Sequence, residues 1–165
     1  MAPHEERPMR KISALVGIAV IDVKDGTKIG EVEEVVVSPD DLRLLGFVVG
    51  SGRFLGHEEH IVETADIRAI GDDAITVDGH EAARTSEAST EAFREARSGK
   101  RRLEGKKVIT EKGSVLGTVS DALLDEEGRQ LSALLIGGGL LQSAETLHID
   151  RVASVGPDVI VAREA

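Results

Sequence analysis

Short apolar runs, separated by turn-forming residues, dominate the hydrophobic pattern of the chain. Most runs are rich in Val and Ile, and stretches such as Asp25-Gly26 and Ser38-Pro39-Asp40-Asp41 lie between them. The pattern predicts strands at 16–23, 29–37, 44–50, 60–63 and 74–77, and again at 107–110, 116–124, 131–137, 146–149 and 159–162. Many short strands without helices between them favour small antiparallel barrels.

One phrase occurs twice and reveals an internal repeat. Residues 25–32 read DGTKIGEV, and residues 112–119 read KGSVLGTV. The similarity extends over Leu, Gly and Val positions on both sides, and the offset between the copies drifts from 88 to 85 residues, which indicates small insertions or deletions in loops. Tandem copies of a unit of about 60 to 65 residues explain the length of the chain.

The glycines of the repeated phrase are interpreted as elements of the fold. We expect Gly26 and Gly113 at hairpin turns, because glycine adopts positive φ freely. Gly30 and Gly117 fall inside predicted strands, where glycine permits a bulge or a sharp coil. The alternative, a phosphate-binding loop, requires a lysine and a following helix that neither phrase provides.

The period of the apolar positions changes between the two copies. Residues 86–99 begin with capping residues, carry acids early and arginines late, and end in Gly, which predicts one helix of about ten residues. The predicted domains are a first barrel over 12–80, a helical linker over 81–102 and a second barrel over 103–163. The fold class is therefore mainly β, with two tandem small antiparallel β-barrels joined by one α-helix.

Several of these stretches, taken in order, resemble the PRC-barrel family. In the first copy they are LVG at 15–17, the phrase running from Asp25-Gly26 to GEV at 30–32, LGFVV at 45–49 and DIRAIGDDAI at 66–75. The second copy echoes the same order at 113–119, 131–136 and 150–156. The two copies together cover most of the chain, and the ordered set occurring twice makes the resemblance specific.

The resemblance implies a kind of function rather than a reaction. The family includes the H subunit of photosynthetic reaction centres and the C-terminal half of the ribosome maturation factor RimM. It implies a barrel that docks on larger assemblies, with no common catalytic residues. We expect this chain to lack the N-terminal membrane helix of the H subunit and the N-terminal domain of RimM, so neither activity transfers directly.

Composition and charge narrow the class of function. Hydrophobic residues make up 41% of the 165 residues, which is typical of a globular protein, and there is no cysteine for a disulfide or a thiolate site. The longest apolar stretch, 12–21, has ten residues, whereas a membrane-spanning helix needs about 20. A net charge of −10 and few aromatics disfavour a nucleic-acid partner. We expect a cytoplasmic protein, or one peripheral to a membrane complex, that has no cofactor.

His57-Glu58-Glu59-His60 is a weak candidate for a metal site. The order HEEH differs from HExxH, which places two histidines one helical turn apart, and we expect a loop leading into a strand here. A solvated acidic loop is the interpretation that we favour. The other acids are scattered over turns and outward strand positions without a nucleophile and base motif, so we expect no catalytic residues and no enzyme activity.

Two groups of residues are candidates for binding a protein partner. The apolar loop residues are Phe54, Leu55, Leu140 and Leu141, and the basic residues are Arg94, Arg97, Arg101 and Arg102. The basic group is a local reversal of charge in an acidic chain, which an anionic partner can meet. The alternative is that it pairs with the protein's own acidic barrels or with a second copy of the chain.

These observations predict a non-enzymatic interaction or scaffold protein that docks on a larger protein assembly by its barrel surface and strand edges. The identity of the partner does not follow from the sequence, and a homo-oligomer is left open. The first alternative is a peripheral subunit, similar to the reaction-centre H subunit, that modulates electron or proton transfer in a membrane complex. The second alternative is a ribosome-assembly factor similar to RimM.

Overall fold

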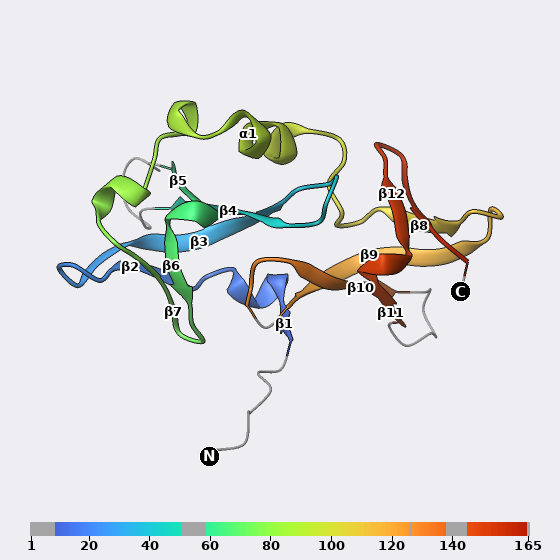
Figure 1. The fold of residues 1–165 in the computed structure, drawn as a ribbon, viewed down its shortest axis with the longest axis horizontal. Helices are drawn as coiled ribbons and strands as arrows, with labels where there is room; N and C mark the ends of the chain where they lie inside the picture. The colour runs from blue at the N-terminus through green and yellow to red at the C-terminus, as the bar shows by residue number, and fades with distance from the viewer. Residues whose placement is uncertain (1–8, 51–58, 126, 138–144, 165) are drawn as a thin grey trace, which may run out of the picture. The chain divides into compact units, whose positions relative to one another are not determined.

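The chain folds into two compact units. The computed structural model describes residues 9–50, 59–125, 127–137 and 145–164. The first unit runs from Ser13 to Arg102, and the second unit combines Leu103–Ala165 with the N-terminal segment up to Ile12. Each unit contains its own curled sheet, as the ribbon in Figure 1 shows. The mainly β fold with one α-helix that the sequence predicts is thereby confirmed.

The first unit is a six-stranded sheet with the strand order β5-β4-β3-β2-β7-β6. Neighbouring strands are antiparallel except β2 and β7, which run parallel. The strands are β2 (Ala19–Asp22), β3 (Thr27–Val37), β4 (Leu44–Gly50), β5 (Glu59–Glu63), β6 (Ile67–Ile70) and β7 (Ala74–Val77). The helical elements are the 3-10 turns η1 (Ile12–Leu15), η2 (Thr64–Asp66), η3 (His80–Ala82) and η4 (Ser86–Ala88), and the α-helix α1 (Glu91–Ser98).

The second unit repeats this topology. Its strand order is β11-β10-β9-β8-β13-β12, again with one parallel pair, between β8 and β13. The elements are β8 (Lys107–Thr110), β9 (Val115–Leu124), β10 (Leu131–Gly137), β11 (Glu145–His148), η5 (Ile149–Arg151), β12 (Val152–Val155) and β13 (Val159–Ala162). A short strand from the N-terminal segment, β1 (Arg10–Lys11), adds to β9 opposite Leu123 and Leu124.

The structure differs from the sequence prediction at several element boundaries. The run at 16–23 forms a strand only from Ala19, and β6 and β12 form without having been predicted. The helix predicted over 86–99 is two elements, η4 and the shorter α1. The break occurs because Ser89 and Thr90 are extended: the Ser89 hydroxyl donates to the carbonyl of Ser86, and the Thr90 hydroxyl accepts from the amide of Phe93 as the N-cap of α1.

The glycines of the repeated phrase have the predicted conformational roles. Gly26 and Gly113 lie at the β2–β3 and β8–β9 turns with φ of 72° and 87°. Gly30 pairs with Val20 beside a bulge in the β2–β3 ladder, and a Cβ there would lie 2.1 Å from the carbonyl oxygen of Gly50. Gly117 is also next to a bulge, where a Cβ would lie 2.6 Å from the carbonyl oxygen of Gly137. Both strands therefore need glycine at this position.

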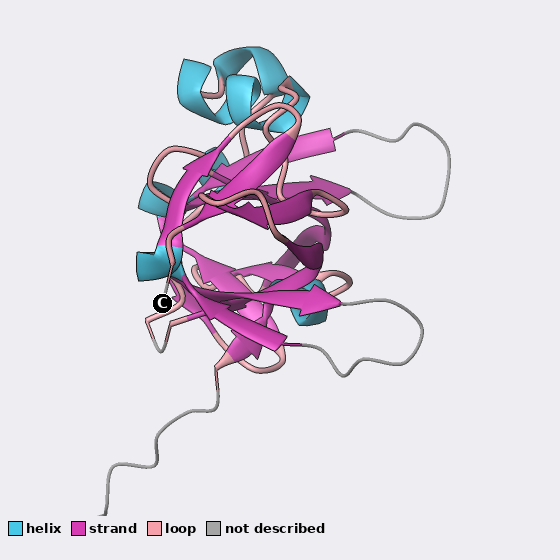
Figure 2. Ribbon diagram, turned by 90° about the vertical axis from the view of Figure 1, so that its right-hand side faces the viewer, coloured by secondary structure: helices cyan, strands magenta, loops and turns pink. Residues whose placement is uncertain are grey.

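Each sheet has one face that forms the core of its unit. In the first unit, Phe47, Val49, Val62, Val20 and Ile75 are fully buried. In the second unit, the fully buried side chains include Val108, Leu124, Leu131, Leu134 and Ile160. In the first unit, α1 lies outside the strands, on the opposite face of the sheet (Figure 2). Across the described parts of the chain, every helix is too short or too polar to cross a membrane.

Candidate functional site

The outer face of the first sheet is covered by α1. Strand side chains alternate between the two faces of a sheet, and Val36, Val48 and Ile61 point away from the core of this unit toward the helix. Phe93 of α1 packs on these three residues and is completely buried. Burying such a side chain stabilises the contact by about 1.5–3 kcal/mol. The helix therefore forms a second apolar layer on the sheet.

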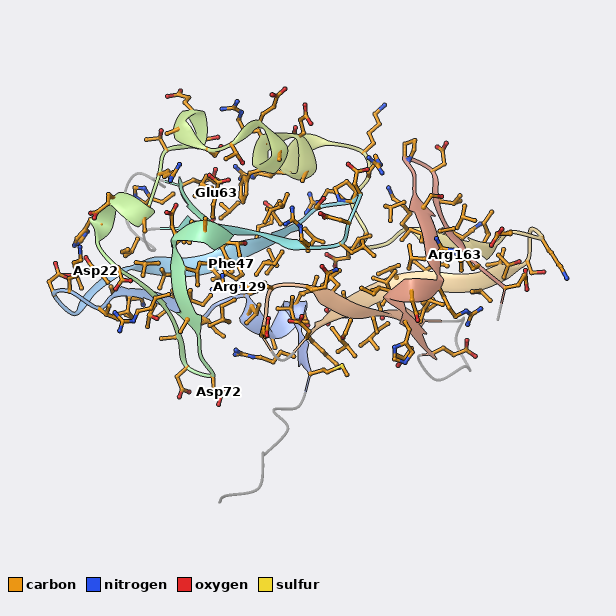
Figure 3. The ribbon with its side chains drawn as sticks, in the orientation of Figure 1. Asp22, Phe47, Glu63, Asp72, Arg129 and Arg163 are labelled. Carbon is orange, nitrogen blue, oxygen red and sulfur yellow. The ribbon has the colours of Figure 1, made fainter. Side chains whose placement is uncertain are left out.

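Three acidic strand residues on this face hold the two ends of the helix. The carboxylate of Glu63 accepts hydrogen bonds from the hydroxyl and the amide of Thr90, the N-cap of α1, at 2.5 and 3.2 Å, and Figure 3 shows Glu63 pointing toward the helix. In the last turn of α1, Arg97 pairs with Glu34 at 3.3 Å and with Glu59 at 2.9 Å. Partial burial disfavours the charged form of Arg97, but the hydrogen bonds and charges of Glu59 and Glu34 outweigh this, so its pKa is raised.

The basic residues predicted to bind a partner all contact acids or carbonyls of the first unit. Arg97 has the two ion pairs just described. The remaining contacts are Arg94 Nη1 to the carbonyl oxygens of Glu87 (2.9 Å) and Ser89 (3.1 Å), Arg101 Nη2 to Asp40 Oδ1 (2.8 Å) and Arg102 Nη2 to Glu34 Oε1 (3.0 Å). Arg97, Arg101 and Arg102 thus hold the helical segment on the rest of the first unit, and Arg94 joins α1 to the turn before it. Their binding of a partner stays a prediction.

A cavity of about 230 Å³ lies between the C-terminal half of α1 and the β3–β4 turn. Its lining combines apolar side chains, such as Leu45 and Ala96, with charged ones, such as Asp40, Glu95 and Arg101. Cofactor and drug-sized sites are larger, at about 300–1,000 Å³. The cavity is therefore smaller than a typical cofactor site.

Asp22, Asp25 and His80 form the one cluster of candidate metal ligands that the described residues contain. Parallel pairing of β2 with β7 places the chain that follows Val77 beside the β2–β3 turn. The Nε2 atom of His80 then lies 3.3 Å from Asp22 Oδ2 and 3.0 Å from Asp25 Oδ2. Asp22 is 1% exposed, and its Oδ1 accepts from the amides of Lys24 at 2.9 Å and Gly79 at 3.0 Å.

Contacts within the cluster shift the pKa values of Asp25 and His80. Hydrogen bonds from Thr27 and His80 lower the pKa of Asp25 to about 2. The hydrogen bond to Asp25 and the negative charges of Asp25, Asp22 and Glu81 raise the pKa of His80. His80 thus bridges the two carboxylates and connects η3 to the β2–β3 turn.

One nitrogen and two oxygens within 4.8 Å of one another are a donor set that suits a divalent cation such as Zn²⁺. The raised pKa of His80 favours the protonated imidazole, which compensates the carboxylate charges without a metal, and Asp22 already has backbone partners. In the second unit the positions equivalent to Asp22 and Asp25 hold Thr110 and Lys112. The cluster is therefore a feature of the first unit alone, with a structural role that its contacts explain.

Comparison with protein-family models finds the PRC-barrel domain twice, at residues 8–84 and 97–164. The two matches cover most of the chain and coincide with the two copies that share one topology. The chain belongs to the PRC-barrel family. PRC-barrel domains are small protein-interaction or scaffold domains, and the family is in general not catalytic. A comparison with curated proteins finds no significant match.

Some residues that the sequence singled out in this PRC-barrel protein lie outside the described parts of the chain. These are the apolar loop residues Phe54, Leu55, Leu140 and Leu141, together with His57. His60 lies in β5, where it pairs with Val49 of β4 and is half-buried. Partner binding by the four apolar residues and metal binding by the histidine pair remain untested predictions.

Sequence reasoning missed the Asp22, Asp25 and His80 cluster. Its members are up to 58 positions apart, and only the parallel pairing of β2 with β7 brings them together. The available signal was the spacing of two aspartates around the β2–β3 turn combined with a histidine three residues after the end of β7. Recognising it would have required predicting one parallel pair in a unit that the pattern indicated to be antiparallel.

Proposed function

We propose that this PRC-barrel protein is a non-enzymatic scaffold that docks on a larger protein assembly. The observation that carries the proposal is the duplicated interaction domain, with two sheets of one topology in a single chain. Two copies allow two contacts with one assembly, and linked contacts bind more tightly than either contact alone. An experiment must identify the protein partner and measure the stoichiometry of the complex.

The use of charged groups supports a non-enzymatic role. The arginines around α1 pair with acids or carbonyls of their own unit. The most perturbed carboxyl, Asp25, is exposed and bound to His80 at a turn rather than directed into a pocket. A catalytic site usually combines a deep pocket with convergent groups of shifted pKa, and the described residues of this chain do not gather in that way.

An affinity-tagged full-length chain, expressed in its native host, tests the proposal. We expect a discrete complex of defined stoichiometry in native size separation, with the same partner proteins found by mass spectrometry in repeated purifications. Both the soluble and the membrane fraction are examined, because a reaction-centre-type membrane complex, a ribosomal particle and a cytoplasmic assembly would each give a different partner set. A chain that stays monomeric and captures no protein in stoichiometric amount would contradict the proposal.

A paired variant tests the loop contacts. Replacing Phe54 and Leu55 by Ser, and separately Leu140 and Leu141 by Ser, removes the apolar side chains that the sequence assigns to docking. We expect each pair to reduce recovery of the complex, because apolar anchors carry much of the energy of an interface. Lys112→Ser, at the exposed β8–β9 turn, is the matched control. Recovery that is equal in all four proteins would remove these loops from the interface.

A further inference from the structure

The second sheet has an outer face equivalent to the one that α1 covers in the first unit. The ladders match residue by residue, bulges included: Val36 pairs with Gly46 as Leu123 pairs with Ala133, and Glu34 pairs with Val48 as Asp121 pairs with Leu135. The β4–β5 and β10–β11 ladders match in the same way, with Ile61 at the position of Thr146. The positions that contact Phe93 in the first unit are therefore Leu123, Leu135 and Thr146 in the second.

The equivalent face is apolar, but no α-helix among the described residues of the second unit covers it. Val36, Val48 and Ile61 are 3%, 1% and 1% exposed under α1, whereas Leu123 and Leu135 are half-buried and Thr146 is exposed. The described part of the second unit contains no α-helix. Its 3-10 turn η5 contacts β10 just as η2 contacts β4 in the first unit, so η5 does not take the place of α1.

The described part of the N-terminal segment, which begins at Met9, extends this surface rather than covering it. Strand β1 pairs edge to edge with β9, which adds a strand to the sheet and not a second layer. Met9, 52% exposed, lies at the margin, with its Sδ 3.1 Å from the hydroxyl of Ser132. Ser132 occupies the position of Leu45, which packs against the α1 cluster in the first unit. The surface thus consists of Met9, Leu123 and Leu135, with Asp121 and Thr146 beside them.

We propose that this outer face of the second sheet binds an amphipathic helix of a partner protein. The template is the chain's own α1, in which Phe93 and Ala96, one turn apart, face the apolar strand residues and Arg97 reaches Glu34. The half-buried Asp121 stands at the position of Glu34. The bound helix accordingly presents apolar residues at i and i+3 and a basic residue at i+4, a recurring mode of helix recognition.

A second copy of this chain is a poorer occupant than a partner helix. The chain offers one α-helix among its described residues, and the apolar side of that helix is already buried on its own sheet. The inference rests on the proposed docking function, since it identifies the partner element that one of the two units would hold. A peptide-binding experiment tests this inference independently of the purification that tests the docking function.

The probe is a helix-stabilised peptide with the sequence of residues 86–102, added to the isotope-labelled full-length protein and followed by NMR. We expect the amide signals around Leu123, Leu135 and Thr146 to shift with peptide concentration. Thr146→Lys places a long charged side chain on the face without disturbing the core, and we expect it to weaken peptide binding about tenfold. Ser154→Lys, an exposed hydroxyl residue on β12 at the other end of the sheet, is the matched control and leaves binding unchanged.

A charge exchange tests the orientation of the helix. A peptide in which the arginine equivalent to Arg97 is replaced by Glu is expected to bind more weakly to the wild-type protein, and Asp121→Arg is expected to restore that binding. Absence of shifts on the second sheet, equal binding by Thr146→Lys and Ser154→Lys, or self-association that buries Leu123 and Leu135 between two copies would each overturn the inference.

The same two variants separate this inference from the proposed function. If the assembly is captured equally well by Thr146→Lys and Ser154→Lys, the docking function stands and the outer face is not its site. If the peptide binds the face but no assembly is captured from the native host, the face recognises helices and the docking function fails. Loss of the assembly in Thr146→Lys alone supports both.

Discussion

The two units share a sheet and differ in what is built on it. Their strand order, parallel pair and bulges correspond position by position, and Gly30 of the first unit corresponds to Gly117 of the second. The first unit adds α1 as a second layer on its outer face, and among its described residues the second unit adds the strand β1 to its sheet and no second layer. In the described parts of the chain, the PRC-type sheet therefore forms both with and without a helix packed on its outer face. This face is where the two copies have diverged.

The turn regions differ in the same manner. At the end of β2 the buried Asp22 accepts two backbone amides, and at the equivalent end of β8 the buried Thr110 accepts one, from Ser114 at 3.2 Å. A short acceptor side chain is thus kept at this position, because a buried amide without a partner is costly. The charge, and with it the contact to His80, is present only in the first unit.

The largest effect is expected from removing the side chain that joins α1 to the first sheet. Phe93→Ala deletes a fully buried ring from the contact with Val36, Val48 and Ile61, which we expect to cost about 3–5 kcal/mol of the stability of that layer. Hydrogen exchange followed by mass spectrometry on the whole chain reports each unit separately. Protection should fall in α1 and in β3 to β5, and stay unchanged in β8 to β13.

The control for this prediction is Ala92→Ser, an exposed position on the same helix. Its cost should stay near the helix propensity difference of about 0.5 kcal/mol. Equal losses of protection in both units after Phe93→Ala would mean that α1 also stabilises the second unit. Unchanged protection of β4 and β5 would mean that the first sheet, like the second, is stable without its helix.

The sequence predicted most of the sheets because their pattern is local. Strands such as β4 and β10 appear as apolar runs bounded by turn residues, and the repeat revealed the duplication. Strands β6 and β12 were missed because IRAI and VASV expose half of their residues and lack an apolar run. The contacts of α1 were beyond local patterns, since the pairing of Arg97 with Glu34 depends on which strand face the helix covers.

The candidate site was less predictable than the fold. The sequence identified the basic group around α1 and left open whether it meets a partner or the protein's own acids, because charge alone does not distinguish the two. The Asp22 and His80 contact follows from a parallel pairing of strands that are distant in the chain. Such pairing is set by the tertiary fold and leaves no periodicity in the sequence.

The next largest effect is expected at the buried acceptor that differs between the units. Asp22→Ala leaves the buried amide of Gly79 and the partly buried amide of Lys24 without their acceptor, at about 1–3 kcal/mol for a buried donor and less for a partly buried one. Thr110→Ala removes the acceptor of a single amide, that of Ser114, and should cost less. Urea denaturation, combined with hydrogen exchange of the amides in the β2–β3 and β8–β9 turns, measures the stability cost of each substitution. Equal costs would show that the second backbone contact of Asp22 contributes nothing.

Smaller effects, of similar size in the two units, are expected at the glycines that lie next to the equivalent bulges. A methyl group at Gly30 or Gly117 would collide with the carbonyl oxygen of Gly50 or Gly137 across the ladder. We expect Gly30→Ala and Gly117→Ala each to cost about 1–3 kcal/mol in their own unit, with exposed Thr118→Ala as the control. If one of the two substitutions unfolded its unit and the other left its unit stable, the two bulges would not be equivalent.

The smallest effect is a pH dependence confined to the first unit, measured as the difference between wild type and His80→Gln. The pKa of His80 in the folded protein lies above its usual 6.5. Its contribution to the stability of the first unit is therefore complete below pH 6.5 and is lost as the pH rises through the raised pKa. The pKa of Asp25 is lowered from 3.8 to about 2, so its contribution is lost as the pH falls through that range. The groups facing His80 are Asp22, Asp25 and Glu81, and Lys24 pairs with Glu81 at 3.9 Å. The wild-type protein should therefore be more stable than the variant between about pH 4 and 6, and this advantage should shrink as the pH rises through the raised pKa of His80. The contributions of the other histidines cancel, because both proteins contain them. A difference that does not change with pH, or that appears in exchange of the β8–β9 turn, would show that His80 does not act through this cluster.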